Sequence, residues 1–359
     1  MKSYTSYFFI IAFFLITSCT EDYQLPNLGS KTTIVITGMI TNEPGLYYVT
    51  VWEYVSNIST GKTIRRDIND AWVTITDNKG NVDELQSFFT VPIEKELYVP
   101  DPVYNPDFSY YLYFYKIPDG KGGYIRFSTA SHFDTREGRY FSTSIKGQPG
   151  QAYTLKVEYA GKEYISTDYM CYGTVIDSVS LEPIGKYIYN KPDGEDGFLV
   201  PCLYFAEPQE ETNFYMFNAY TNFYANQANS LEPLKNTALE LIFQSGYYSW
   251  PVSVISDRFL PSYVYKYKLS DGDSDRKYLS GSDMGFERWE YDEIGVVQLY
   301  CITEPVYRYF MELSRQYYYD GGAFSPSPAS PPTNISGGAQ GCFIAASVSQ
   351  YVLDLRKEK

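Results

Sequence analysis

The segment PGQAYTLKVEYAGKEYISTDYM, residues 149–170, has the pattern of a β-hairpin. Its first half carries an apolar residue at every second position, which is typical of a strand with one buried face. A turn follows at 160–162, and apolar residues return at Tyr164 and Ile165. The alternating residues of the first half are Tyr153, Leu155 and Val157.

Similar segments precede this hairpin. KTTIVITGMI (31–40) and LYYVTVWEYV (46–55) alternate in the same way and are separated by a turn at 42–45. AWVTITDNKGN (71–81) reads as a further hairpin with a turn at its Asp-Asn-Lys-Gly sequence. Short strands at this spacing predict a mainly β fold, with an immunoglobulin-like or transthyretin-like β-sandwich over residues 31–172.

The second half predicts a separate β-rich unit over residues 173–359. Strand-like segments begin at 174 and 197, and the chain closes with the alternating segment GCFIAASVSQYVLDL (341–355). EPVYRYFMELSRQYYYDGG (304–322) has apolar residues at helical spacing, with Pro early and two Gly at the end. Because strands and helices do not alternate, we expect an antiparallel domain with one helix.

The N-terminus resembles a bacterial lipoprotein signal. Lys2 precedes the apolar run FFIIAFFLI, and Ile-Thr-Ser comes directly before Cys19. We therefore expect residues 1–18 to be removed, Cys19 to be acylated, and residues 19–30 to form a tether that begins with two acids, Glu21 and Asp22. An ordinary secretory signal is the alternative.

The composition excludes several function classes. The formal charge is −14, which argues against binding to nucleic acid. The single histidine, His132, lies in a polar turn and provides no basis for a triad or a His-rich zinc site. Four cysteines remain after Cys19, and both two disulfides and free buried thiols are open interpretations. They are Cys171, Cys202, Cys301 and Cys342.

Aromatic loops are the best binding candidates. The segment GYYSW (246–250) offers Tyr247, Tyr248 and Trp250 for contact with a ligand or a protein, with a structural loop as the equal alternative. The acidic loop 271–283 lacks the Gly and Glu of a calcium loop, and we favour a solvated loop there. The sequence predicts no catalytic residue, no metal and no cofactor.

The order of several segments resembles the domain-of-unknown-function 4249 lipoproteins of Bacteroidota. The matching pieces after the signal are VITGMITNEPGLYYVTV, AWVTITDNKGN, PGQAYTLKVEYAGKEYISTD, VIDSVSLEP, ISDRFLPSYVY, VYRYFMELSRQ and PPTNISGGAQGCFIAASVS. This resemblance implies an outer-membrane lipoprotein, often found alongside TonB-dependent transporters, with no established catalytic residues. The acidic start at Glu21 and Asp22 resembles the signal that exports lipoproteins of this lineage to the cell surface, so we expect surface exposure, with a plain solvated linker as the alternative.

Together these features predict a lipid-anchored binding or accessory protein of a TonB-dependent transporter system. Contact with the transporter is expected through loops 245–251 and 322–336. A surface glycan-binding or glycan-cleaving protein is the alternative. An enzyme is the less favoured class, because no motif singles out a pair of carboxylates.

Overall fold

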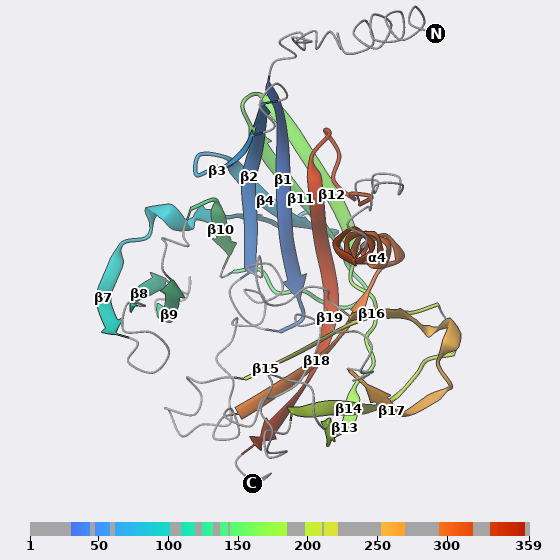
Figure 1. Cartoon of the computed structure of the whole chain (residues 1–359). Coiled ribbons are helices and arrows are strands. Elements are labelled where there is room, and N and C mark those ends of the chain that lie inside the picture. Colours follow the sequence, from blue (N-terminus) through green and yellow to red (C-terminus); the bar gives the residue numbers. More distant parts are fainter. Residues whose placement is uncertain are drawn as a thin grey trace, which may run out of the picture.

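Figure 1 shows the fold in a computed structural model of the whole chain. The described residues are 30–43, 47–57, 62–100, 109–118, 124–131, 137–142, 144–184, 198–209, 212–221, 253–269, 294–318 and 331–355.

The described part of the chain is mainly β, as predicted. The strands of its first half are β1 (Ser30–Thr41), β2 (Tyr47–Asn57), β3 (Lys62–Asp67), β4 (Trp72–Asp77), β5 (Val82–Glu84), β6 (Gln86–Ser87), β7 (Ile93–Pro100), β8 (Ser109–Pro118), β9 (Tyr124–Ser131), β10 (Arg139–Ser142), β11 (Ala152–Tyr159) and β12 (Lys162–Tyr169). The second half contributes β13 (Ile176–Ile184), β14 (Phe198–Ala206), β15 (Phe214–Thr221), β16 (Ser253–Ser256), β17 (Tyr263–Lys268), β18 (Ile294–Ile302) and β19 (Gln340–Asp354). Helix α4 (Glu304–Tyr318) is accompanied by two single 3-10 turns, η1 (Phe88–Thr90) and η2 (Asp257–Phe259).

One large sheet runs through both halves of the molecule. Its strand order is β16-β15-β18-β19-β1-β2-β10-β6, and β3 pairs with β2 beside β10. The last strand, β19, pairs antiparallel with β18 over residues 347–354 and parallel with β1 over residues 340–346. This parallel pairing, which joins the two ends of the described chain, is absent from the sequence-based expectation (Figure 1).

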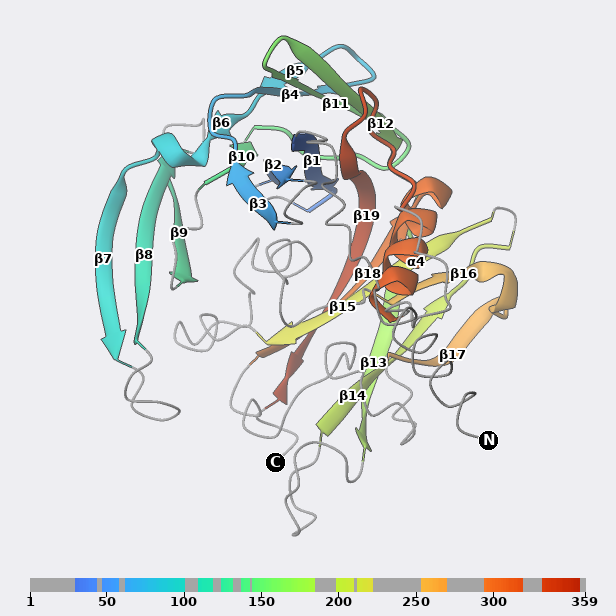
Figure 2. The same cartoon turned by 45° about the horizontal axis from the view of Figure 1, so that its top comes forward.

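The N-terminal sandwich forms where the sheet β12-β11-β4-β5 packs on the large sheet. Val73 and Ile75 of β4 pack with Ile36 of β1 and Val51 of β2 in one buried cluster, which we call the first cluster. Figure 2 shows β4, β5, β11 and β12 lying across β1 and β19. The hairpin of residues 149–170 contributes Tyr153, Leu155, Val157 and Tyr164 to the same cluster. The predicted sandwich is therefore confirmed, and β19 completes it.

The hairpin differs from the expected one in a detail. Its turn consists of Ala160 and Gly161, both with positive φ (50° and 73°), and β12 begins at Lys162. Tyr164 is buried, whereas Ile165 is 39% exposed because neighbouring residues of a strand point to opposite faces.

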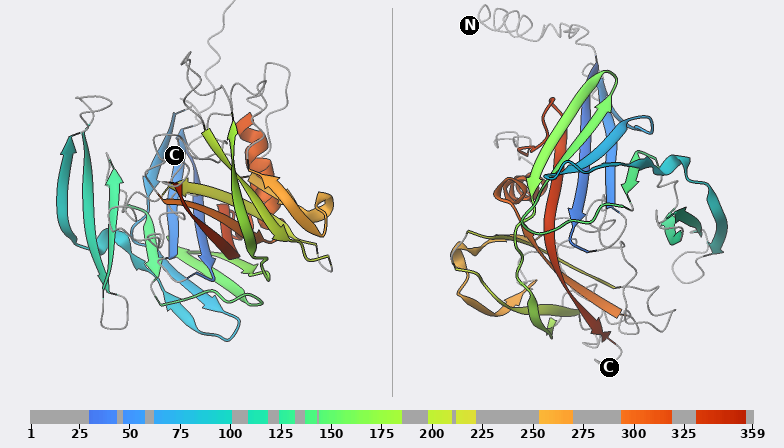
Figure 3. Two further views of the ribbon diagram at one scale, coloured as in Figure 1. Left: turned by 90° about the horizontal axis from the view of Figure 1, so that it is seen from below. Right: turned by 180° about the vertical axis from the view of Figure 1, so that it is seen from behind.

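The C-terminal part covers the other end of the large sheet. Helix α4 packs Val306 and Phe310 into the first cluster, with Tyr309 and Leu313 partly buried beside them, as their helical spacing predicts. On the opposite face of β15 and β18, the sheet β13-β14-β17 encloses a second cluster around Phe205, Phe217 and Leu299 (Figure 3). The predicted antiparallel pairing of this part and its helix are confirmed.

A three-stranded sheet, β7-β8-β9, stands apart from the sandwich in Figure 3. The Tyr-rich segment SYYLYFY forms its central strand, β8. The division of the chain at residues 172 and 173 stays a prediction, because β19 contributes to the packing of both parts.

Candidate functional site

The residues that the sequence singles out for function lie outside the described residues. They are Cys19, Tyr247, Tyr248 and Trp250. The same holds for His132 and for the acidic loop 271–283. Their roles stay predictions.

Loop 322–336 is described from residue 331 onward. Asn334 binds the backbone of Phe343 twice: its Nδ2 donates to the carbonyl at 2.7 Å, and its Oδ1 accepts from the amide at 3.0 Å. The Ser336 amide donates to the carbonyl of Ile165 at 2.8 Å. This end of the loop is therefore built into the sandwich.

None of the four described cysteines forms a disulfide. Cys202, Cys301 and Cys342 are buried, and Cys171 is partly exposed. Of the two interpretations left open by the sequence, the structure supports free thiols that pack as small apolar residues. Burial, together with the nearby carboxylate of Asp168, raises the pKa of the Cys342 thiol.

Asp168 is a buried carboxylate that ties three elements together. Its Oδ1 accepts from Thr303 Oγ1 at 2.6 Å, directly before α4, and its Oδ2 accepts from the amide of Ala345 in β19 at 2.8 Å. Burial raises the pKa of Asp168 to about 6, against the lowering effect of these hydrogen bonds. Because both carboxylate oxygens accept hydrogen bonds from other parts of the chain, we assign Asp168 a structural role.

A second buried carboxylate, Glu207, follows β14. Asn213 Nδ2 donates to Glu207 Oε1 at 3.0 Å, while the Asn213 amide donates to Asp257 Oδ2 at 2.6 Å. Burial raises the pKa of Glu207, and a hydrogen bond from the Tyr215 hydroxyl opposes that rise. The carboxylates of Glu207 and Asp257 thus both bind Asn213, directly before β15, and hold the ends of β15 and β16 in place.

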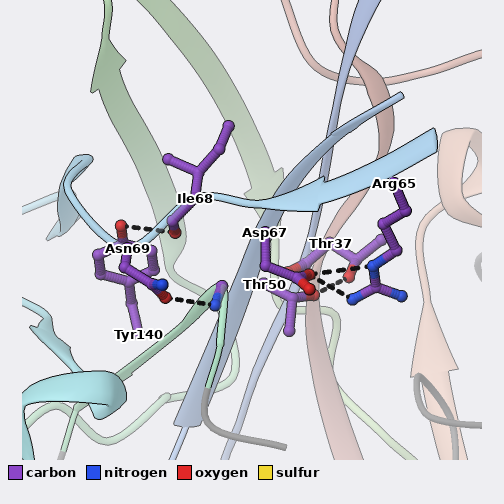
Figure 4. A network of polar contacts seen from close by, with 8 residues as sticks. Thr37, Thr50, Arg65, Asp67, Ile68, Asn69 and Tyr140 are labelled. Carbon is purple, nitrogen blue, oxygen red and sulfur yellow. Dashed lines mark hydrogen bonds and ion pairs between the residues drawn. The ribbon is translucent and has the colours of Figure 1, made fainter. Parts of the chain in front are cut away.

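An exposed cluster of a different kind lies on β2 and β3. The Arg65 guanidinium lies over the Trp52 ring, 4.7 Å from its centroid, and donates to Asp67 Oδ1 from Nε (3.0 Å) and Nη2 (2.7 Å). Figure 4 shows Arg65 reaching back to Asp67 along β3, with Thr37 and Thr50 behind them. A guanidinium held on an indole by a carboxylate presents its remaining N–H groups outward.

The segment after β3 is held by hydrogen bonds to β10 and to the residues directly before it. The Tyr140 hydroxyl donates to the carbonyl of Ile68 at 2.9 Å, and Asn69 Oδ1 accepts from the amide of Gly138 at 2.6 Å (Figure 4). Gly138 has φ +71°, and a Cβ there would lie 2.7 Å from the carbonyl oxygen of Val51. The cluster therefore rests on a rigid support.

The rest of β3 is basic and exposed. Arg66 forms an ion pair with the buried Glu53 while its own side chain stays 65% exposed, and Ile64 is 66% exposed. Lys31 of β1 is exposed two strands away. We call the set Lys31, Lys62, Ile64, Arg65 and Arg66 the basic edge. The sequence analysis did not single it out, although KTIRRD (62–67) concentrates cations in an acidic chain.

A second exposed surface is the outer face of β4, β11 and β12. Trp72 is 45% exposed, and Lys156 Nζ lies 5.7 Å from its ring centroid. Ile165 and Tyr169 emerge on the same face, 39% and 44% exposed. The face also carries a Thr154–Thr167 hydroxyl contact of 2.8 Å and the ion pairs of Lys156 with Glu158 and Glu163. We call this surface the Trp72 face.

Within the described ranges, no three His, Cys, Asp or Glu side chains are grouped so that they could hold a metal ion. The helices of the same ranges include none with the length and apolar character needed to cross a membrane.

Comparison with known proteins places the chain in a family. Neither a curated protein nor a solved structure matches it significantly. The model of the family described as "Domain of unknown function (DUF4249)" matches residues 20–351, nearly the whole chain beyond the predicted signal. The chain therefore belongs to the DUF4249 family.

Proposed function

We propose that this protein is a lipoprotein of the outer membrane, exposed at the cell surface, that serves as a binding or accessory component of a TonB-dependent transporter. The Trp72 face carries this proposal: three large exposed side chains lie on strands of a rigid sandwich, where contact requires little ordering. The predicted signal and Cys19 provide the anchor.

The proposed mechanism is non-covalent. Acyl chains on Cys19 confine the body to the membrane surface, which raises its effective concentration toward a barrel in the same membrane. A contact of modest affinity then gives a lasting complex, through which the body caps the channel, captures a ligand or stabilises the barrel.

The anchor is tested by Cys19→Ala. We expect this variant to leave the membrane fraction and to lose labelling by fatty acid, because the acyl chains attach to that sulfur. Continued labelling and outer-membrane fractionation of the variant would contradict the anchor.

The partnership is tested by affinity purification from detergent-solubilised outer membranes. We expect a TonB-dependent barrel to accompany the native protein and to be lost from the variant Trp72→Ala/Ile165→Ala/Tyr169→Ala. The matched control, Phe89→Ala/Val175→Ala/Tyr265→Ala, removes three exposed apolar side chains elsewhere and should retain the barrel. A second variant, with Tyr247, Tyr248 and Trp250 changed to Ala, tests the predicted loop.

Recovery of no barrel with the native protein would contradict the partnership. Full recovery with the Trp72-face variant would contradict only that contact surface.

Glycan binding is the second candidate function, and the exposed Trp72 ring, on the same sheet face as the Thr154 and Thr167 hydroxyls, favours it. Flat aromatic rings contact sugars through their faces. We expect affinity electrophoresis in polysaccharide gels to show retardation that Trp72→Ala abolishes if this function holds, and equal mobility with and without polysaccharide if it does not.

A further inference from the structure

The basic edge lies at one end of the N-terminal sandwich, and strand pairing fixes its place. Ser30, the first described residue, pairs with Asn57 at the end of β2, and Asn57 pairs with Lys62 at the start of β3. The chain toward Cys19 therefore joins the body beside Lys62. In Figure 1 this end of β1 and β2 lies at the top of the molecule, away from β13–β18.

The basic edge concentrates positive charge in an acidic chain. The whole chain has 29 Lys and Arg against 43 Asp and Glu. Arg65 pairs with Asp67 and Arg66 with Glu53, and the side chains of these two acids are 21% and 4% exposed against 51% and 65% for their arginines. The cationic heads are thus more accessible than the carboxylates that pair with them.

The guanidinium groups keep donors for a further anion. Arg65 donates Nε–H and one Nη2–H to Asp67, and the ion pair of Arg66 with Glu53 runs through its Nη2. A guanidinium has five N–H donors, so each retains several that suit phosphate oxygens. Ile64, 66% exposed on the same face of β3 as Arg66, provides an apolar side chain for the boundary between headgroups and acyl chains.

We propose that the basic edge docks on the anionic phosphate headgroups of the membrane that holds the protein. This inference rests on the lipid anchor of the proposed function. The tether from Cys19 to Ser30 reaches at most about 40 Å when extended, so the anchor alone leaves the orientation of the body open. Contact through the basic edge turns the sandwich toward the membrane and the part formed by β13–β18 away from it.

The charge distribution favours a lipid surface over a protein strand as the occupant. Basic residues beside a membrane attachment point bind anionic lipids, each strengthening partition about fivefold. Charged residues on an edge strand also oppose the pairing of that edge with another strand. The acidic remainder of the body is repelled by the same headgroups, which leaves one preferred orientation.

The experiment uses the body without its lipid, residues 20–359, because both hydrophobic clusters and all described sheets lie within residues 30–355. Flotation with phosphatidylcholine vesicles is compared with flotation with vesicles containing about 30% phosphatidylglycerol, a charge density comparable to that of anionic membranes. We expect retention by the anionic vesicles only, lost at high salt because the contact is between exposed charges.

The variant Lys31→Gln/Lys62→Gln/Arg65→Gln should weaken partition about 100-fold, at about fivefold per cation. Arg66 is kept because it pairs with the buried Glu53. The control Lys146→Gln/Arg258→Gln/Arg308→Gln makes the same change in charge at exposed sites elsewhere and should partition like the parent. Circular dichroism and size-exclusion chromatography verify that both variants are folded and monomeric.

Equal flotation with both kinds of vesicle, or an equal loss in both variants, would overturn the proposal. So would loss of the transporter from the basic-edge variant with unchanged vesicle binding, which would assign the edge to a protein. Failure of the proposed function is read separately, from the Cys19→Ala and purification experiments, because the vesicle assay needs neither acylation nor a barrel.

Discussion

At the residue scale, the body depends on a few positions where side-chain size or charge is tightly constrained. Asp168 is 6% exposed and joins β12, α4 and β19 through one carboxylate. Gly341 has φ +104° and lies against β1, where a Cβ would come 1.9 Å from the carbonyl oxygen of Ile36. Both residues belong to the contact between the first half of the chain and its last strand.

The buried carboxyl of Asp168 predicts a pH-dependent stability. Its folded-state pKa of about 6 is above its ordinary value of 3.8, so the native state binds the proton more tightly than the unfolded state does. The stability from this group is complete below about pH 4 and is lost as pH rises through about 6, a change of ~3 kcal/mol.

Asp168→Asn removes the titration but keeps the shape and an acceptor for the Ala345 amide. We expect urea unfolding at pH 4.5 and 7.5 to show a smaller difference in the free energy of unfolding for this variant than for the native protein. Identical differences would show that Asp168 titrates normally.

Gly341→Ala is expected to destabilise the protein by more than ~3 kcal/mol, because positive φ strain is combined with a clash against β1. The matched variant Gly338→Ala also has positive φ, 80°, but no atom lies within 4 Å of its Cβ. It should lose only ~1–2 kcal/mol. Chemical denaturation measures both, and equal losses would contradict the close approach at Gly341.

At the element scale, α4 is held by its apolar stripe and by its first turn. Val306 and Phe310 are fully buried, whereas Arg308 on the outer side bonds Glu304 one turn earlier at 2.6 Å. Thr303 precedes the helix, and its hydroxyl binds Asp168 of the sandwich. Helix α4 is therefore connected to β12 through Thr303 and to the core through Val306 and Phe310.

Phe310→Ala should destabilise the protein by about 3–5 kcal/mol, since it opens a cavity in the first cluster. Arg308→Ala on the same helix removes an exposed pair and should change stability by less than ~0.5 kcal/mol. Thermal unfolding of the two variants checks this difference, and a tolerated Phe310→Ala would place the helix outside the core.

At the scale of the whole molecule, the two halves share β19. Residues 340–346 complete the first sandwich beside β1, and residues 347–354 continue the sheet beside β18. The first cluster accordingly contains Cys342, Ile344 and Ala346 together with residues of β1 and β2. A strand with two partners couples the unfolding of the two parts.

The shared strand predicts that residues 30–172 do not fold alone. Without β19, the edge of β1 is unpaired and the apolar residues of the first cluster lose their cover. We expect this fragment to show little β signal in circular dichroism, and the addition of a peptide of residues 331–355 to restore it. A stably folded fragment would support two independent domains instead.

The sequence by itself determined the local structure. Strict alternation fixed the strands of the 149–170 hairpin, turn residues fixed their ends, and apolar spacing over 306–313 fixed the helix, because these signals depend on neighbours within a few residues. Resemblance of short motifs also pointed to the DUF4249 family.

The tertiary structure alone decided how distant segments meet. The parallel pairing of β1 with β19 joins residues about 300 positions apart, and no local pattern encodes a partner. The roles of Asp168 and Glu207 likewise depend on burial by elements far along the chain. The basic edge and the Trp72 face were missed because their side chains come together only once the strands are in register.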